Sequence, residues 1–227
     1  MNIVQEMWSW LTSTSSWGGA EGIGTRLAQH VGYSLLALAF AAIIGIGVGI
    51  YVGHTGKGQG VVLGTSGILR AMPTLGLLTF LALVIPSGVT VPLLPATVVL
   101  VILAVPSVLA ATASGILAID RNTVDAAKAM GYSSRQIITD LELPLALPVL
   151  VGGIRSAWLQ VVATATVSAY LGLGGLGRYL LDALAVRDYA VMLGAAIIVA
   201  ALALVTDMVL AVLQKISVPA GMAGGEV

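Results

Sequence analysis

Three charged residues lie inside long apolar stretches of this sequence, where a formal charge needs a compensating partner. Arg70, Arg155 and Asp207 are each flanked by runs of Val, Leu, Ile, Ala and Gly. In a membrane-spanning helix such groups are costly, usually face the protein interior and pair with one another. We therefore predict that Asp207 pairs with Arg155 or, as the weaker alternative, with Arg70. Another possibility is that one arginine extends to the lipid headgroups while Asp207 stands in an aqueous vestibule.

The composition excludes most other site chemistry. The chain has no cysteine, which rules out disulfides, thiolate catalysis and cysteine-ligated metals. Two histidines, His30 and His54, are too few for a histidine-rich metal site. We expect no catalytic residue, no metal site and no cofactor in this chain.

Two glycine-rich stretches match nucleotide-binding loops only superficially. GLGGLG at 172–177 satisfies G-x-G-x-x-G, a pattern that has meaning only between a strand and a helix of a βαβ unit. GHTGKGQG at 53–60 has glycine after Lys57 and so lacks the phosphate-loop sequence. Neither stretch predicts a nucleotide site, so this chain is not expected to hydrolyse ATP.

The elements that must carry these residues are membrane helices. Of 227 residues, 58% are hydrophobic and 9% are charged, whereas soluble domains carry about 25% charged residues. A membrane helix needs about 20 apolar residues. We predict an all-α membrane protein with spans at about 30–52, 60–85, 95–118, 146–170 and 190–213. A proline in the second span, Pro73, should kink or break it, and a plain kink and a break are both open.

The ends and the basic residues predict an orientation. Residues 1–24 carry Trp8, Trp10 and Trp17, which suit an extracytoplasmic segment at the membrane interface; a disordered extension is the alternative. Placing 119–145 inside puts five basic residues in inner segments (Lys57, Arg121, Lys128, Arg135, Lys215) and three in outer ones (Arg26, Arg178, Arg187). The positive-inside rule then places the N-terminus outside and the tail 216–227 in the cytoplasm. A net charge of zero argues against a nucleic-acid partner.

The polar segment 119–145 separates two of these spans. Asn122 or Thr123 is expected to cap a first short helix, and Gly131 to end it in a positive-φ turn. Ser133 followed by Gln136 matches a capping box that opens a second helix, which Pro144 should end.

The apolar residues of this segment are too sparse to span a bilayer. They are well placed to dock on a protein, although an amphipathic loop resting on lipid is an alternative. These residues are Val124, Ala127, Met130, Ile137 and Leu141.

The same segment resembles the EAA motif of the permease subunits of ABC importers, with spacing Glu-Ala-Ala, three residues, Gly, nine residues, Ile-x-Leu-Pro. The matching residues here are Asp125, Ala126, Ala127, Gly131, Leu141, Leu143 and Pro144. Asp replaces the first Glu and Leu replaces Ile. The resemblance implies a type I ABC importer permease fold in which this loop is a cytoplasmic coupling helix, Met130 included, that contacts an ATPase subunit.

Flanking stretches, including RAMPTLGLLTFL and AYLGLGGLGRYL, resemble permeases of osmoprotectant importers. The resemblance implies a small solute such as glycine betaine, choline, carnitine or proline. It also implies two ATPase subunits that bind ATP and magnesium, a second permease subunit (the same chain or a paralogue) and an extracytoplasmic solute-binding protein. Importers of methionine and related solutes are the alternative, and a secondary transporter without an ATPase is a weaker one, since no inverted repeat is found.

Several residues are candidates for the transport pathway or its gate. Residues 172–177 are expected to form a flexible outer loop near the gate. The candidates are Pro73, Thr74, Trp158, Tyr170, Gly172, Gly174 and Gly175. Aromatic residues make up only 5% of the chain, so solute selectivity is expected to lie in the binding protein. Gly45, Gly47 and Gly49 predict close helix packing, either within one subunit or, as the weaker alternative, at a dimer seam.

Overall fold

A computed structural model describes residues 2–216, except the side chains of Leu63, Thr65, Ser66 and Arg70, and every element it contains is helical. The first half of the chain forms α1 (Ile3–Thr12), α2 (Thr14–Trp17), α3 (Ile23–Thr55), α4 (Gln59–Ala71), α5 (Thr74–Val84) and α6 (Leu93–Leu117). The second half forms α7 (Arg121–Ala129), α8 (Ser134–Gln136), the π-helix η1 (Ile137–Glu142), α9 (Leu143–Ala165), the 3₁₀ helix η2 (Thr166–Leu171), α10 (Gly177–Val186) and α11 (Tyr189–Ile216). Beyond Ile216, the predicted tail lies outside the described residues.

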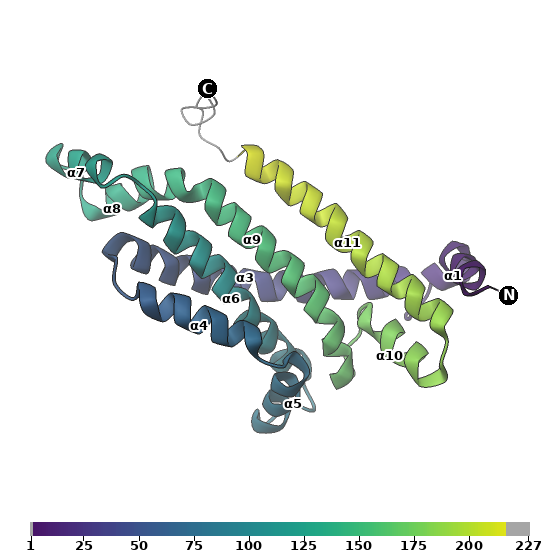
Figure 1. The fold of residues 1–227 in the computed structure, drawn as a ribbon. Helices are drawn as coiled ribbons and strands as arrows, with labels where there is room; N and C mark the ends of the chain where they lie inside the picture. The colour runs from purple at the N-terminus through teal and green to yellow at the C-terminus, as the bar shows by residue number, and fades with distance from the viewer. Residues whose placement is uncertain (1, 217–227) are drawn as a thin grey trace.

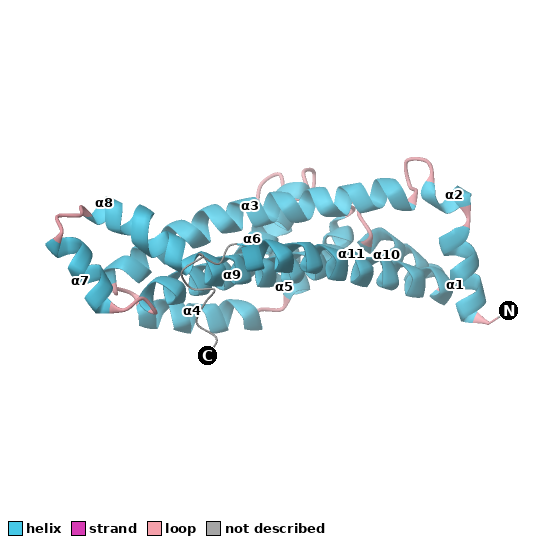
Figure 2. Ribbon diagram, turned by 90° about the horizontal axis from the view of Figure 1, so that it is seen from above, coloured by secondary structure: helices cyan, strands magenta, loops and turns pink. Residues whose placement is uncertain are grey.

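Four helical stretches in the described chain are long and apolar enough to cross a membrane, and a bent pair makes a fifth candidate. The four are α3, α6, the run Ser134–Leu171 and α11, and they lie side by side along the long axis of the molecule (Figures 1 and 2). The number agrees with the five predicted spans. At 33 residues, α3 is about 50 Å long, which exceeds the hydrocarbon core. The helix begins at Ile23, seven residues before the predicted start of this span.

The second predicted span is broken at Pro73 rather than kinked. Helices α4 and α5 meet at an angle of 95°. Met72 has φ −68° and ψ 133°, the extended conformation that a residue before proline prefers. Pro73 is the N-cap of α5, where its missing N–H breaks no helical hydrogen bond.

Small residues bring α3 and α6 into close contact. Ala41, Gly45, Gly49 and Gly53 recur every four residues along one face of α3, and all are buried. A Cβ on Gly45, Gly49 or Gly53 would lie 2.8, 2.5 or 2.7 Å from the Cβ atoms of Val108, Thr112 and Ile116, respectively. These glycines therefore pack within one subunit, as the favoured alternative predicted, whereas Gly47 lies on the exposed side with open space around it.

Helix α6 packs with its other side on α9. A Cβ on Gly153 would lie 2.2 Å from the Cβ of Ala111 and 3.0 Å from the Ser107 carbonyl oxygen. Val108, Ala157 and Val161 belong to one buried cluster that joins α3, α6 and α9. The three helices form the centre of the fold, with α6 in the middle.

The N-terminal segment is an ordered helix rather than a disordered extension. Asn2 caps α1 with a complete capping box. Trp10 packs edge-on against Tyr179 of α10 and closely approaches Gly194 of α11. Trp8 and Trp17 remain exposed.

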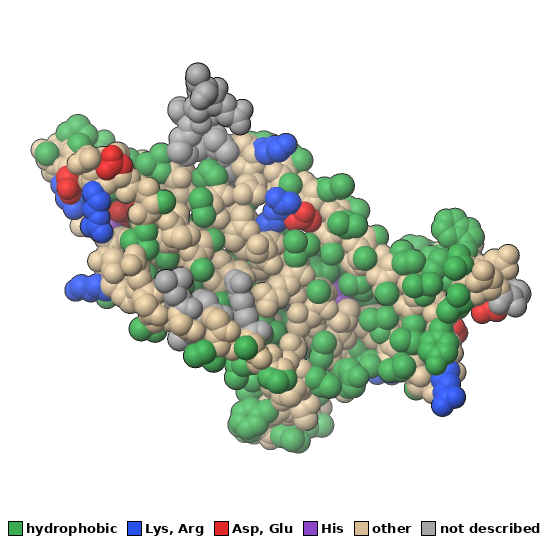
Figure 3. Space-filling model, in the orientation of Figure 1, with side chains coloured by type: hydrophobic (Ala, Val, Ile, Leu, Met, Phe, Trp, Pro, Cys, Tyr) green, Lys and Arg blue, Asp and Glu red, His purple; other side chains and the backbone are tan. Residues whose placement is uncertain are grey.

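The outer faces of the long helices are apolar. Figure 3 shows hydrophobic side chains spread along the molecule, with charged side chains mainly near its two ends. On α11 the exposed residues include Leu204, Val205, Met208 and Val212. Such a surface suits contact with lipid.

Candidate functional site

The polar segment between α6 and α9 lies at one end of the bundle and projects beyond it (Figures 1 and 2). Its first helix, α7, is capped by Asp120, whose carboxylate accepts a hydrogen bond from the Asn122 N–H at 3.0 Å. The predicted cap at Asn122 or Thr123 is wrong, because these residues lie inside the first turn. Asp120 precedes the helix and places a negative charge at its positive end.

Helix α7 ends in a Schellman turn at Gly131. The Gly131 N–H donates to the Lys128 carbonyl at 2.9 Å, and the Tyr132 N–H donates to the Ala127 carbonyl at 3.1 Å. Gly131 has φ +88°, the positive-φ conformation predicted for it. The turn directs the chain back toward the membrane spans.

Replacing Gly131 tests this turn without any steric conflict, because a Cβ there would meet nothing within 4 Å. Gly131→Val is expected to strain the turn by about 1 kcal/mol or more, since a β-carbon disfavours positive φ. On the ATPase coupling that the resemblance implies, we expect it to lower transport and to uncouple ATP hydrolysis while the protein still inserts in the membrane. Gly131→Asn is the matched control, because asparagine tolerates this conformation. Equal transport by both variants would show that strain in this turn does not affect transport.

The second helix of the segment does not end at Pro144. Ser133 and Gln136 form the predicted capping box. Beyond it, however, helix runs without a break through η1 into α9, and Pro144 lies in the first turn of α9. Because the helix is continuous, the missing N–H of Pro144 removes one hydrogen bond from it, and the wider π-helical turn accommodates the proline. The second helix is therefore the continuation of a membrane span and is not separate from it.

One side of this segment forms a partly apolar groove of about 490 Å³ between α7 and η1. Its lining residues are Asn122, Thr123, Ala126, Ala127, Met130, Tyr132, Asp140 and Leu141. Met130 is 71% exposed at its edge. The structure thus brings Ala126, Ala127, Met130 and Leu141 together, while Leu143 and Pro144 begin α9.

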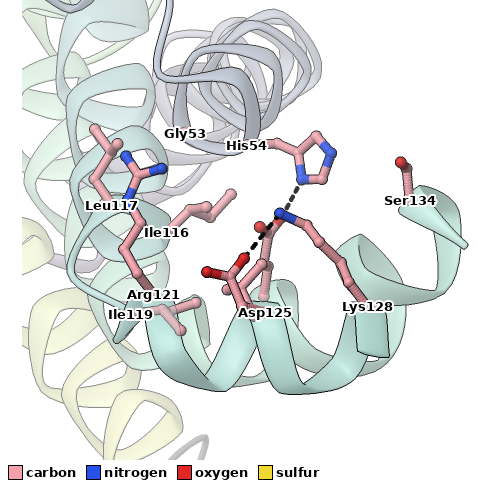
Figure 4. A pocket seen from close by; sticks show the side chains of 11 residues that line it. Gly53, His54, Ile116, Leu117, Ile119, Arg121, Asp125, Lys128 and Ser134 are labelled. Atoms are coloured by element: carbon pink, nitrogen blue, oxygen red, sulfur yellow. Dashed lines mark hydrogen bonds and ion pairs between the residues drawn. The ribbon is translucent and has the colours of Figure 1, made fainter. Parts of the chain in front are cut away.

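Asp125 lies on the other side of α7. It forms an ion pair of 3.2 Å with Lys128, and both side chains are exposed. The two residues line a polar cavity of about 330 Å³ between α7 and the ends of α3 and α6 (Figure 4).

Two residues in this cavity were not identified from the sequence. The Nδ1 atom of His54, at the end of α3, lies 2.9 Å from Oε2 of Glu142 in η1. Glu142 is only 4% exposed. The sequence signal was an acidic residue at the variable position of the Leu-x-Leu-Pro match, between apolar neighbours.

The structure pairs Asp207 with Arg155, the arginine favoured from the sequence. The two Asp207 oxygens accept from Nε and Nη2 of Arg155 at 2.5 and 2.7 Å. Arg155 Nη1 also donates to Gln214, whose amide in turn donates to the Pro148 carbonyl. This network fastens α11 to α9. Arg70 lies in α4, but its side chain lies outside the described part of the structure.

The pathway candidates belong to several different elements. Pro73 and Thr74 lie at the break between α4 and α5. Trp158 is buried, and its indole N–H donates to Thr206 of α11 at 2.6 Å. Tyr170 is 55% exposed at the end of η2.

The loop 172–177 packs tightly on the first half of α3. The Gly175 N–H donates to Gln29 at 2.9 Å, and a Cβ on Gly174 would lie 2.0 Å from the Gln29 Oε1 atom. Gly172 and Gly175 have φ +81° and +91°. The glycines therefore serve close packing and tight turning, which the prediction of a flexible loop did not anticipate.

Comparison with known proteins gives consistent matches over most of the chain. The family model described as "Binding-protein-dependent transport system inner membrane component" matches residues 41–220. The chain is 31% identical to the choline transport system permease protein OpuBB of Bacillus subtilis (strain 168) over 86% of this chain and 88% of that protein. It is 32% identical to the carnitine transport permease protein OpuCB of Listeria monocytogenes, over 82% and 84%.

The fold is similar to that of a solved transporter. Inward-facing structures of the MetNI methionine ABC transporter contain a chain that matches with a TM-score of 0.75 and 22% identity. The match covers 87% of this chain and 96% of that chain. At this level of identity the likeness is one of fold.

Proposed function

The chain belongs to the family of binding-protein-dependent transport system inner membrane components, and from that premise we propose that it imports a compatible solute. The chain acts as the transmembrane permease subunit of an ABC importer. The solute is a quaternary amine such as glycine betaine, choline or carnitine, or else proline. The observation that supports this most is the similarity, over more than four fifths of the chain, to permeases named for choline and carnitine.

Energy enters through α7 and η1, the coupling segment. Two ATPase subunits bind ATP and magnesium, and each contacts one permease subunit at the groove that Met130 borders. A second permease subunit, a copy of this chain or a paralogue, completes the pathway. A solute-binding protein delivers the solute outside the cell.

The orientation follows from the coupling segment. If α7 contacts an ATPase, the end of the molecule that carries α7 is cytoplasmic, and α1, at the other end in Figure 2, is extracytoplasmic. The N-terminus is then outside, and Trp8 and Trp17 lie at the outer membrane interface.

Transport alternates between two states. ATP binding closes the ATPase subunits and displaces the coupling segment. Because η1 and α9 form one continuous helix, the displacement passes through η1 into a membrane span. The spans rock so that the pathway opens outward to the loaded binding protein, and hydrolysis returns them inward. This chain supplies no bond chemistry and no cofactor.

Solute selectivity resides mainly in the binding protein. Quaternary amines are usually recognised by aromatic cages, and Trp158 is buried with its N–H bonded to Thr206. Of the candidate aromatic residues, Tyr170 is the exposed one. The permease therefore provides a pathway of low selectivity.

Uptake into proteoliposomes tests the proposed solute. The complete importer, purified through a tag on this chain, is reconstituted with its binding protein and supplied with labelled glycine betaine, choline, carnitine, proline or methionine. We expect ATP-dependent uptake of at least one of the first four. Uptake of methionine alone would favour the amino-acid alternative, and uptake without ATP would favour a secondary transporter.

A further inference from the structure

Glu142 is a buried carboxylate at the point where the coupling segment becomes a membrane span. It is 4% exposed, and His54, located 88 residues earlier in the chain, lies 2.9 Å away. The two side chains are thus within hydrogen-bonding distance of each other. A carboxylate is costly to bury unless a hydrogen-bonded partner compensates it. An apolar residue would fill this position at lower cost, so the contact calls for a functional explanation.

The position of Glu142 in the helix is unusual. It is the last residue of the π-helix η1, which joins α8 to α9. Short π-helical turns inside α-helices are frequent at functional sites and are points where a helix bends. On its own, such a turn would absorb part of any displacement of α7 and α8.

His54 belongs to a part of the molecule that is firmly packed. It is the second-last residue of α3. Its neighbour Gly53 lies so close to α6 that a Cβ would be 2.7 Å from that of Ile116. The end of α3 is therefore held against α6, and His54 connects this pair of helices to η1.

We propose that the His54–Glu142 contact positions η1 so that displacement of the coupling segment reaches α3 and α6 as well as α9. This inference rests on the proposed function. Without the contact, α9 alone follows α7 and α8, and bending at the π-helix dissipates part of the movement. His54 and Glu142 are thus positioning residues that act through the helices they join.

The surrounding cavity fits this role. Arg121, Asp125 and Lys128 of α7 line the same polar space as His54 and Glu142 (Figure 4). The hydrogen bond itself joins α3 to η1. Movement of α7 therefore changes the surroundings of the contact directly.

Transport per ATP tests the proposal in the complete, reconstituted importer. The double variant His54→Leu with Glu142→Met removes the contact without leaving a buried charge. We expect labelled glycine betaine delivered per ATP hydrolysed to fall about fivefold or more, the lower end of the range for energetic coupling between sites. The single variant His54→Asn, with Glu142 unchanged, should keep most of the ratio, because the amide nitrogen of asparagine lies near the position of Nδ1. Lys57→Gln, at an exposed position three residues after His54 and outside the coupling segment, is the control and should leave the ratio unchanged.

A distance measurement provides a readout that does not depend on the solute. The chain has no cysteine, so within it spin labels on Thr55→Cys and Arg135→Cys report only α3 and α8, and the partner subunits are used with any cysteines replaced. In the otherwise unchanged importer we expect the distance between the labels to stay nearly constant when ATP binds. In the His54→Leu, Glu142→Met background it should change or broaden.

The outcomes separate this inference from the proposed function. A wild-type chain that captures no ATPase contradicts the proposed function. A wild-type importer that couples hydrolysis to uptake, together with a double variant of equal ratio and an equally constant distance, overturns the role of the contact. Loss of ATPase capture by the double variant also overturns it, because the contact is assigned to transmission and not to docking.

Discussion

Gly49→Leu is expected to destabilise the protein, whereas Gly47→Leu leaves its stability nearly unchanged. A Cβ on Gly49 would lie 2.5 Å from the Cβ of Thr112 and 3.1 Å from the Leu109 carbonyl oxygen. The obstacle includes backbone, so α3 and α6 must separate. Forcing extra atoms into a well-packed interface typically costs about 1–3 kcal/mol, and the cost here should lie at the upper end of that range.

Gly47 is the matched control because it lies two residues away on the exposed side of the same helix, with nothing within 4 Å of an added Cβ. The thermal midpoint of unfolding in detergent, with membrane insertion checked separately, compares the two variants. Equal midpoints would show that α3 and α6 do not pack as described.

Asp207→Ala is expected to destabilise the chain more than Asp207→Ala combined with Arg155→Ala. The single change leaves the Arg155 guanidinium beside apolar helices, with Gln214 as its remaining described partner. Removing one member of such a pair leaves an uncompensated charge, whereas removing both does not. The same thermal midpoint, measured for both single variants and the double variant, gives the interaction between the two residues.

A second ion pair in the chain offers a control for this cycle. Arg178 and Asp182 form a similarly close pair on α10, four residues apart, with Asp182 well exposed. Exposed ion pairs on one helix contribute little to stability. The effects of Arg178→Ala and Asp182→Ala on the thermal midpoint should therefore be nearly additive. Additivity at Arg155–Asp207 as well would show that the pair contributes no more than a surface pair.

Much of the fold follows from local sequence signals. Long apolar runs predict the spans, because hydrocarbon requires helices of about 20 residues. Gly131 could be assigned a positive φ because a glycine between two capping signals has few other roles. The pairing of Asp207 with Arg155 was predictable because two opposite charges in apolar surroundings rarely remain apart.

The remaining features depend on contacts that the sequence does not encode locally. Pro144 signals a helix end, but the π-helix before it allows one continuous helix. The His54–Glu142 contact joins residues 88 positions apart, and no local pattern connects them. The packing of Gly174 and Gly175 on Gln29 likewise requires the three-dimensional arrangement of α3 and the loop.

Capture of an ATPase through the coupling segment tests the central claim most directly. The tagged chain is purified from solubilised membranes, and the ATP hydrolysis of the captured complex is measured. Asp125→Lys with Met130→Glu alters two exposed residues of the segment, and Lys57→Glu alters an exposed charge outside it. We predict that the wild-type chain and Lys57→Glu retain an ATPase whose activity responds to the binding protein, and that the double variant loses it. Equal capture by all three chains, or no ATPase with the wild-type chain, would contradict the account.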